Sequence, residues 1–283
     1  MIVKKVAVIG GGTMGNGIAH VFAMSGFEIN LVELNKELLD KALSTITRNL
    51  DRQIKKDIIS EKDKKDILSR INPVEGIEKT PEDVDLVIEA IIENKEAKLD
   101  VFNRLQSIIK TDSVFASNTS SISITELSTS SRPDKFIGMH FMNPVPVMKL
   151  VEIIRGYSTS DETFNTIKEL SEKLGKVPVE VFDYPGFVSN RILMPMINEA
   201  IFSLMEGVAS KEDIDTVMKL GMSHPMGPLT LADFIGLDVC LAILEVLYTG
   251  FNDSKYRPCP LLKKMVAAKK LGRKSGEGFF KYE

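Results

Sequence analysis

A glycine-rich turn near the N-terminus constrains the fold more than any other feature of this chain. It follows the short apolar run Val6–Ile9 and has the spacing G-x-G-x-x-G. The first glycine of such a turn permits a tight bend, the second lets the backbone approach a pyrophosphate, and the third lets the next helix pack on the strand. Glycines can also simply form a turn, but a helix-compatible run follows here, and the N–H groups at a helix start bind phosphates. The expected cofactor contacts of the turn are Gly10, Gly12, Thr13, Met14 and Gly15.

An acidic residue at the end of the second apolar run supports dinucleotide binding. Glu33 follows Ile29–Val32 and stands 18 residues after Gly15, close to the spacing at which a carboxylate binds a ribose diol. The same carboxylate would repel the 2′-phosphate of NADP, and no arginine follows it directly. The sequence therefore favours NAD as the cofactor, with NADP the less favoured alternative because Lys36 stands nearby.

Short apolar runs alternate with helical stretches over residues 1–185, which indicates βαβ units and a parallel sheet. We therefore predict an α/β fold with an N-terminal Rossmann-like doubly wound sheet as the NAD-binding domain. Segment 36–71 is long enough for two helices where one crossover helix would suffice, so a helical insertion is expected there. The expected strands are Val6–Ile9, Ile29–Val32, Val84–Glu89, Ser113–Ala116, Phe136–Met139 and Val177–Phe182, with helices at 94–109 and 161–174.

The pattern changes after Pro185 and Gly186, which both interrupt regular structure and mark the predicted domain boundary. Beyond them, apolar residues recur at three and four positions, as on one face of a helix. We predict a smaller all-helical C-terminal domain over residues 186–283. Its expected helices include 211–220, 230–247 and 260–271.

The composition argues against several classes of protein. Thirty-six Lys and Arg against 39 Asp and Glu give a net charge of −3, which does not suit a nucleic-acid binder. No apolar run reaches the roughly 18 residues of a membrane-spanning helix. Two cysteines and three histidines provide neither a disulfide framework nor metal-ligand spacing. We expect no nucleic-acid, membrane or metal partner, no signal peptide before Val6, and a cytoplasmic location.

Six further segments carry a resemblance that covers nearly the whole chain. The sequence resembles the short-chain L-3-hydroxyacyl-CoA dehydrogenase family, most closely its stand-alone bacterial 3-hydroxybutyryl-CoA members. The resemblance implies NAD-dependent, reversible conversion of (S)-3-hydroxyacyl-CoA to 3-oxoacyl-CoA. It also implies a homodimer formed through the C-terminal domain. The segments are 10–19, Ser117–Ser121, Gly138–Val145, Gly186–Arg191, His224–Pro228 and Gly272–Phe279.

The resemblance assigns the chemistry to a histidine and a glutamate. Oxidation of a secondary alcohol needs a base for the hydroxyl proton, and histidine suits this task near neutral pH. His140 matches the family's general acid/base, and Glu152 matches the glutamate that orients it. Most single histidines are structural residues, but His140 enters a loop at the carboxyl edge of the sheet, where ligands collect. Glu152 lies within an apolar strand, where a lone charge needs a partner.

Two polar residues match substrate contacts of the family. Ser120 and Asn190 would hydrogen-bond the substrate oxygen and stabilise developing negative charge during reduction. Each also has a structural alternative as a helix cap, which is most plausible for the neighbouring Ser121. The resemblance further implies cofactor contacts at Glu93, Lys98, Asn118, Ser120, Asn143 and Lys274.

The 36–71 insertion matches a helix pair that contacts CoA in the family. Arg52 and Lys56 stand four residues apart, which would place them on one helix face, where they would bind the CoA phosphates. Ordinary solvated charge is an equal alternative for both. Met142 stands where phenylalanine is common in the family, so packing of the acyl chain or nicotinamide could differ here.

Three other functions stay open at this stage. A related dehydrogenase could act on a free hydroxy acid, and a relative of the same fold could bind nucleotide without catalysis. A fragment of a multifunctional β-oxidation protein fits poorly, because no hydratase-like segment precedes the glycine turn. The direction of the reaction and the acyl chain length stay open. The compact sequence without a transit segment suggests a bacterial or archaeal cytoplasm, and hence short-chain fermentation.

Overall fold

The computed structural model describes residues 2–282. The chain divides into two compact units, the first ending at Asp183 and the second beginning at Tyr184. This division lies two residues before the boundary expected at Pro185 and Gly186. Each unit has its own hydrophobic core.

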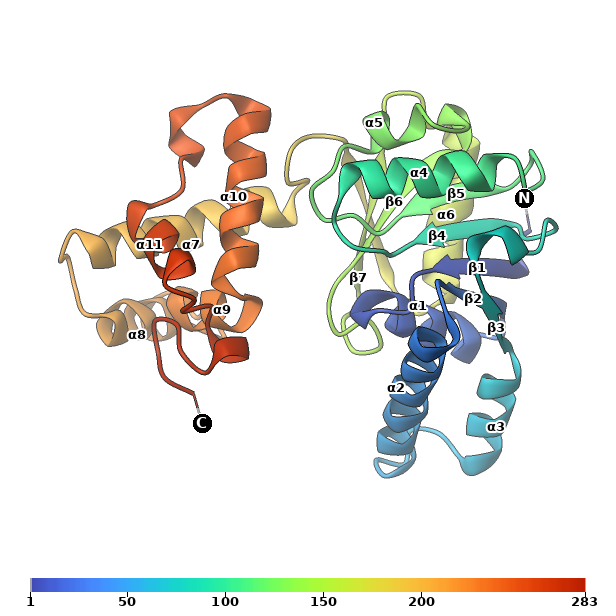
Figure 1. Ribbon diagram of the computed structural model, residues 1–283. Coiled ribbons are helices and arrows are strands. Elements are labelled where there is room, and N and C mark those ends of the chain that lie inside the picture. The colour runs from blue at the N-terminus through green and yellow to red at the C-terminus, as the bar shows by residue number, and fades with distance from the viewer. Residues whose placement is uncertain (1, 283) are drawn as a thin grey trace. The chain divides into compact units, whose positions relative to one another are not determined.

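Eight strands form one sheet within the described part of the first unit (Figure 1). Neighbouring strands are parallel except for β6 and β7, which are antiparallel. Central strands are completely buried, as expected when helices cover both faces. The predicted α/β fold is confirmed. In spatial order the strands are β3 (Ile71–Glu75), β2 (Glu28–Glu33), β1 (Lys5–Ile9), β4 (Leu86–Glu89), β5 (Val114–Ser117), β6 (Phe136–Phe141), β7 (Leu150–Arg155) and β8 (Val177–Phe182).

Two features of the sheet differ from the predicted parallel pattern. The edge strand β3 is absent from the expected set because Asn72, Pro73 and Glu75 interrupt its apolar residues, and a proline is tolerated at a sheet edge. Strand β7 runs antiparallel to β6 because only residues 142–149 connect them. A parallel pair needs a crossover of a dozen or more residues.

Helices cover the sheet and extend the first unit beyond it. The 36–71 segment forms two helices, α2 and α3, which lie side by side and project from the sheet (Figure 1). Asn35 caps α2 and Ser60 caps α3, each accepting a backbone N–H with its side chain. The helices of this unit are α1 (Thr13–Met24), α2 (Lys36–Ile54), α3 (Glu61–Ser69), α4 (Lys95–Gln106), α5 (Ile124–Ser128) and α6 (Asp161–Lys173).

The second unit is helical, and one predicted helix is divided. The expected helix 230–247 is interrupted at Gly236, whose φ of 106° is a conformation that only glycine adopts readily. No helix among residues 2–282 is long and apolar enough to cross a membrane. The helices are α7 (Ser189–Met205), α8 (Lys211–Gly221), α9 (Pro228–Ile235), α10 (Leu237–Phe251) and α11 (Pro260–Ala267).

Candidate active site

The glycine turn has the geometry that a dinucleotide requires. Gly10 has a φ of 96°, and a Cβ there would lie 2.8 Å from the carbonyl oxygen of Ala90. A Cβ at Gly15 would lie 1.7 Å from the carbonyl oxygen of Gly10, so α1 packs this close only with glycine. A Cβ at Gly12 would meet no atom within 4 Å. The space beside Gly12, the second glycine of the motif, is therefore open, and a phosphate can approach the backbone at the start of α1.

Glu33 is held at this turn by two backbone groups. Its Oε1 accepts the N–H of Gly11 at 2.7 Å, and its Oε2 accepts the N–H of Leu34 at 3.0 Å. The carboxylate is thus fixed at the carboxyl end of β2 and remains partly exposed. The residues present fit a nicotinamide dinucleotide, with the diphosphate on the glycine turn and a ribose at Glu33.

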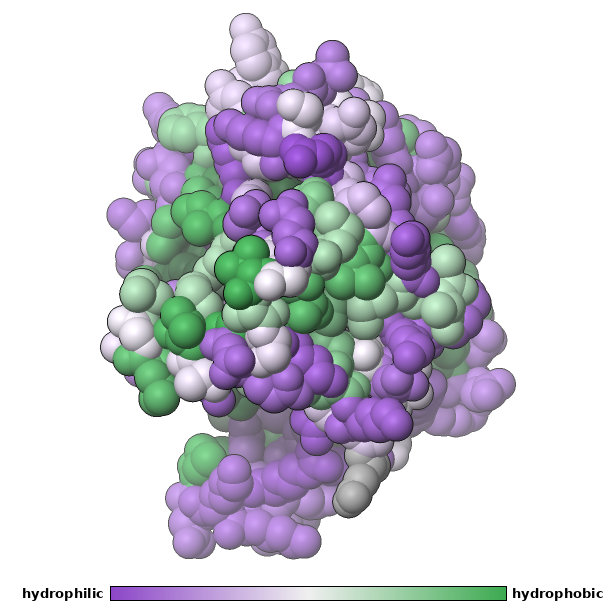
Figure 2. Space-filling model, turned by 90° about the vertical axis from the view of Figure 1, so that its left-hand side faces the viewer, coloured by the Kyte–Doolittle hydropathy of each residue, from purple (hydrophilic) through white to green (hydrophobic). Residues whose placement is uncertain are grey.

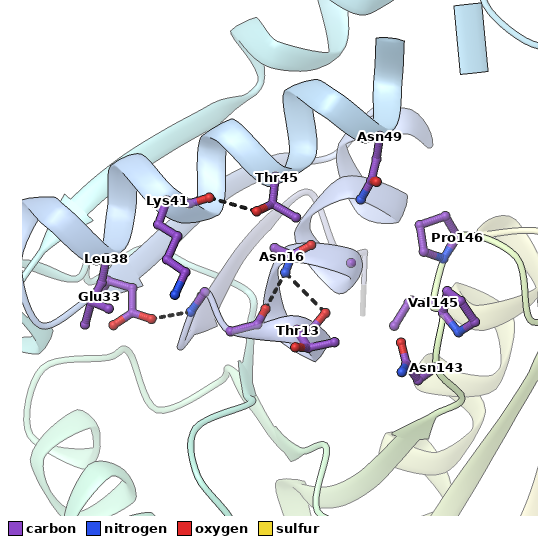
Figure 3. A pocket seen from close by; sticks show the side chains of 14 residues that line it. Thr13, Asn16, Glu33, Leu38, Lys41, Thr45, Asn49, Asn143, Val145 and Pro146 are labelled. Atoms are coloured by element: carbon purple, nitrogen blue, oxygen red, sulfur yellow. Dashed lines mark hydrogen bonds between the residues drawn. The ribbon is translucent and has the colours of Figure 1, made fainter. Parts of the chain in front are cut away.

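A pocket of about 340 Å³ opens beside the turn (Figure 3). One wall is the face of α2 that carries Lys41, and the other is the loop that carries Asn143. Its lining residues are Gly11, Gly12, Thr13, Asn16, Gly17, Glu33, Leu38, Lys41, Thr45, Asn49, Asn143, Pro144, Val145 and Pro146.

Four polar residues of this pocket were not anticipated from the sequence. Lys41, Thr45 and Asn49 come from α2 at a spacing of four, which places them on one helix face. The spacing of four is the one sequence signal that could have identified these three residues, but the solvated faces of helices show the same pattern. Asn16 donates its side-chain N–H groups to the carbonyl oxygens of Gly12 at 2.5 Å and Thr13 at 3.2 Å, which steadies the turn.

His140 and Glu152 face each other across the antiparallel strands β6 and β7. They are direct register partners, and Nδ1 of His140 lies 2.7 Å from Oε2 of Glu152. Both residues are buried. An ionised Glu152 favours the tautomer with the proton on Nδ1, which leaves the lone pair of the neutral ring on Nε2. Such a ring can take up a proton at Nε2 while Glu152 balances the charge.

The loop after β5 carries the predicted residues Asn118 and Ser120. Asn118 Oδ1 accepts the N–H of Phe141 at 3.0 Å, so this loop is tied to the residue after His140. The N–H of Ser120 donates to Oε1 of Glu93 at 2.9 Å. The alternative that Ser121 caps the next helix is wrong, because Ser123 caps α5.

The loop after β6 carries Asn143 and is held by a residue that sequence reasoning missed. The buried ammonium of Lys176 donates to the carbonyl oxygens of Val145 at 2.5 Å and Met148 at 2.7 Å. Burial lowers the pKa of Lys176. A single lysine between a helix and a strand gives no sequence signal of such a role.

The expectation that Arg52 and Lys56 share a helix face is wrong. Helix α2 ends at Ile54 with Lys55 as its C-cap, and the positive φ of Asp57 continues the chain in a turn. Both cations are exposed, and Arg52 Nη1 donates to Asn49 Oδ1 at 3.4 Å.

Two predicted site residues belong to the second unit. Asn190 lies buried near the start of α7. Lys274 lies in the glycine-rich C-terminal turn, where its ammonium pairs with Asp238 at 2.6 Å. Their contribution to the site stays a prediction.

Comparison with known proteins decides the family. The NAD binding domain model of 3-hydroxyacyl-CoA dehydrogenase matches residues 5–184, and the C-terminal domain model of the same family matches residues 186–282. The chain belongs to the 3-hydroxyacyl-CoA dehydrogenase family. It is therefore a dehydrogenase that uses a nicotinamide cofactor, and the family and enzyme class predicted from the sequence are confirmed.

Relatives within this family match over nearly their full length. A probable 3-hydroxybutyryl-CoA dehydrogenase of Deinococcus radiodurans is 57% identical over 98% of this chain and 100% of its own. The human mitochondrial hydroxyacyl-coenzyme A dehydrogenase is 43% identical over 100% of this chain and 92% of its own. The crystal structure of (S)-3-hydroxybutyryl-CoA dehydrogenase from Ralstonia eutropha is 49% identical, with a TM-score of 0.97 and full coverage of both chains.

Proposed function

We propose that this dehydrogenase catalyses the reversible oxidation of (S)-3-hydroxyacyl-CoA to 3-oxoacyl-CoA, with 3-hydroxybutyryl-CoA and acetoacetyl-CoA as the principal pair. The names of its relatives support the substrate class. The observation that carries the chemistry is the buried pair of His140 and Glu152, joined at 2.7 Å. A histidine with one nitrogen engaged by a carboxylate is suited to exchange a proton at the other.

Each of the four candidate catalytic residues has its own role in the proposed reaction. During oxidation, Nε2 of His140 takes the proton of the C3 hydroxyl, and Glu152 stabilises the imidazolium that forms. Bound NAD supplies the acceptor for the hydride that leaves C3. Ser120 and Asn190 hydrogen-bond the substrate oxygen as its charge changes. In the reverse direction His140 returns the proton to the alkoxide oxygen, so one site serves both directions.

We assign NAD rather than NADP as the cofactor. The carboxylate of Glu33 is fixed by the N–H groups of Gly11 and Leu34. A carboxylate in this place accepts hydrogen bonds from the ribose hydroxyls and repels a 2′-phosphate. Lys41 also lines the pocket, and its charge would suit either the diphosphate or that 2′-phosphate. In the second case Lys41 would favour NADP, whereas Glu33 favours NAD.

We assign the remaining predicted contacts by the chemistry of their side chains. Arg52 and Lys56 are exposed cations that would bind CoA phosphates from the end of α2. Asn143 lines the pocket and Lys274 is a cation, so both suit the cofactor. The reduced, buried thiols of Cys240 and Cys259 are consistent with a cytoplasmic location.

We also propose that the enzyme is a homodimer through its C-terminal unit. Apolar side chains gather on the face of this unit seen in Figure 2, and contiguous exposed apolar surface often marks an interface. Sedimentation equilibrium should give a mass of two chains, and Leu220→Glu should shift it toward one. The most exposed large apolar residues of the unit are Ile192, Val208, Leu220 and Met222.

The decisive experiment measures NADH and NADPH oxidation by the purified protein, with acetoacetyl-CoA and free acetoacetate as substrates. Fast turnover with NADH and the thioester only is expected. Equal turnover of free acetoacetate would point instead to a hydroxy-acid dehydrogenase. Tight NADH binding without turnover of either substrate would place the protein among non-catalytic nucleotide binders.

A further inference from the structure

Gly17 lies inside α1, two residues after the G-x-G-x-x-G motif, and lines the pocket beside the glycine turn. Its φ lies outside the left-handed region, so the backbone does not require glycine here. Glycine also weakens the interior of a helix relative to alanine. What favours glycine at this place is a close contact with the loop after β6.

The loop after β6 packs directly on Gly17. A Cβ at Gly17 would lie 3.0 Å from Cβ of Val145 and 3.1 Å from its Cγ2, with Cδ of Pro146 at 3.6 Å. Carbon atoms in contact are ordinarily about 3.5–4.0 Å apart. The methyl group of an alanine at this position therefore fits only if Val145 moves away from α1.

Val145 is also held from within the loop and from its other side. Its side chain is buried, and its carbonyl oxygen accepts the ammonium of Lys176 at 2.5 Å. Pro144 and Pro146 flank it and restrict the backbone rotations of the loop. The N–H of Val147 donates to the carbonyl oxygen of Pro144 at 2.9 Å. A loop of this kind is stiff, so a displacement of Val145 is passed on to its neighbours.

Asn143 is the neighbour that matters for the cofactor. It precedes Val145 by two residues, and both line the pocket on the side opposite Asn16 (Figure 3). The separation of Val145 from α1 therefore sets the width of the pocket at Asn143. Pushing Val145 outward would carry the amide of Asn143 away from the start of α1, where the dinucleotide is expected.

We propose that Gly17 is a positioning residue for Asn143. The absence of a side chain at Gly17 lets Val145 pack against α1, and this contact places Asn143 at the distance that the cofactor needs. Gly17 acts through the loop and not by a hydrogen bond of its own. This proposal rests on the cofactor contact given to Asn143 in the proposed function.

A pair of compensating substitutions tests the proposal through the NADH dissociation constant, measured by fluorescence titration. Gly17→Ala should raise it about three- to tenfold, the usual effect of losing one neutral hydrogen bond. Val145→Ala removes the Cγ2 atom that the new methyl group would meet. In the Gly17→Ala background it should therefore recover most of the lost affinity, because residues in contact do not act independently. Losses that multiply in the double variant would overturn the proposal.

An Asn143→Ala background separates positioning from direct obstruction of the pocket. Asn143→Ala should itself weaken NADH binding, and Gly17→Ala should then add little, because its route to the cofactor is already removed. If Gly17→Ala weakens binding equally with and without Asn143, the new methyl group obstructs the cofactor directly and the proposal is wrong.

Steady-state kinetics give a second readout. Gly17→Ala should raise KM for NADH by a factor similar to that for binding, while kcat at saturating NADH stays nearly unchanged. A lower kcat with an unchanged KM would contradict the proposal. If Gly17→Ala does not fold, Val145→Ile enlarges the facing side chain instead and should weaken NADH binding in the same way, and unchanged binding would overturn the proposal.

Gly221→Ala is the matched control. Gly221 lies at the end of α8, and a Cβ there would meet no atom within 4 Å. This variant adds the same methyl group to a helix in open space and should leave NADH binding unchanged. A loss as large as that of Gly17→Ala would overturn the specific role of Gly17. A wild-type enzyme that binds NADH without turnover would refute the proposed function alone, since the binding measurements still test Gly17.

Discussion

Two loops at the carboxyl edge of the same sheet are held in opposite ways. The loop Thr119–Ser121 presents N–H and hydroxyl donors, and the carboxylate of Glu93 accepts them. The loop after β6 presents carbonyl oxygens at Val145 and Met148, and the ammonium of Lys176 donates to both. In each case one charged side chain satisfies backbone groups that have left the sheet ladder. The sign of the charge follows from which groups the loop offers.

The two loops differ in how that charge is balanced. Glu93 lies beside the ammonium of Lys98. Among the described residues no ion pair of Lys176 is found, and burial is the one cause of its lowered pKa, so carbonyl dipoles balance its ammonium. Holding a loop therefore does not require an ion pair, provided that the hydrogen bonds are made. The loop with a balanced charge carries Ser120, and the loop without one carries Asn143.

The largest effect on turnover is expected at His140, which lies in neither loop. His140→Ala should lower kcat by about 10²–10⁴, the usual contribution of a general acid/base, while the NADH dissociation constant stays nearly unchanged. Steady-state kinetics and fluorescence titration measure the two. His224→Ala, at a histidine outside the sheet, is the control. Unchanged turnover of His140→Ala would refute the assignment of the base.

Lys176→Met should remove the hydrogen bonds that hold the loop after β6. The variant leaves the carbonyl oxygens of Val145 and Met148 without their donor, which should cost about 1–3 kcal/mol in the free energy of unfolding. Urea unfolding measures this, and NADH titration should show weaker binding because Asn143 lies in the same loop. Lys173→Met, at an exposed lysine three residues earlier, should change neither. Equal effects of both variants would contradict a specific role for Lys176.

Glu33→Ala tests whether another carboxylate acts on a loop or on a ligand. Glu33 accepts the N–H of Gly11, much as Glu93 accepts those of its loop. If Glu33 also binds the ribose, the variant should weaken NADH binding about tenfold, the effect of losing a hydrogen bond to a charged group, and NADPH binding less. Titration with both cofactors measures this, with Glu37→Ala as an exposed control. Equal weakening would mean that Glu33 only supports the glycine turn.

The smallest effect is expected at His20, a buried histidine of the first unit. It is fully buried in α1, and burial lowers its pKa while Gln53 opposes that shift. Below its unfolded pKa near 6.5, the unfolded chain takes up a proton more readily than the folded one. Stability should therefore fall as pH decreases from 7 toward 5, by at most about 1.4 kcal/mol per pH unit from this group.

Replacing His20 isolates this contribution. His20→Leu should reduce the dependence of the unfolding free energy on pH, measured by urea unfolding at pH 5, 6 and 7. Parallel pH profiles for the variant and the wild-type protein would contradict it.

The contrast between local and long-range contacts explains what could be predicted from the sequence. The glycine turn was predictable because each glycine answers a local steric demand, as the contacts at Gly10 and Gly15 illustrate. The family motifs named His140 and Glu152, but their pairing depends on strand register. Lys176 acts on residues 28 and 31 positions away, so no local pattern reveals it. Lys56 was misplaced because the end of α2 depends on a turn at Asp57 rather than on spacing.

The register of β6 against β7 has a consequence for how a preparation of this enzyme is judged. His140 and Glu152 meet only because residue 140 lies opposite residue 152. A slip of one residue would turn Glu152 to the other face of the sheet while leaving a compact, hydrogen-bonded sheet behind. Circular dichroism would scarcely distinguish the two molecules. Specific activity per mole of chain therefore reports the fraction of molecules whose strands joined in the correct alignment.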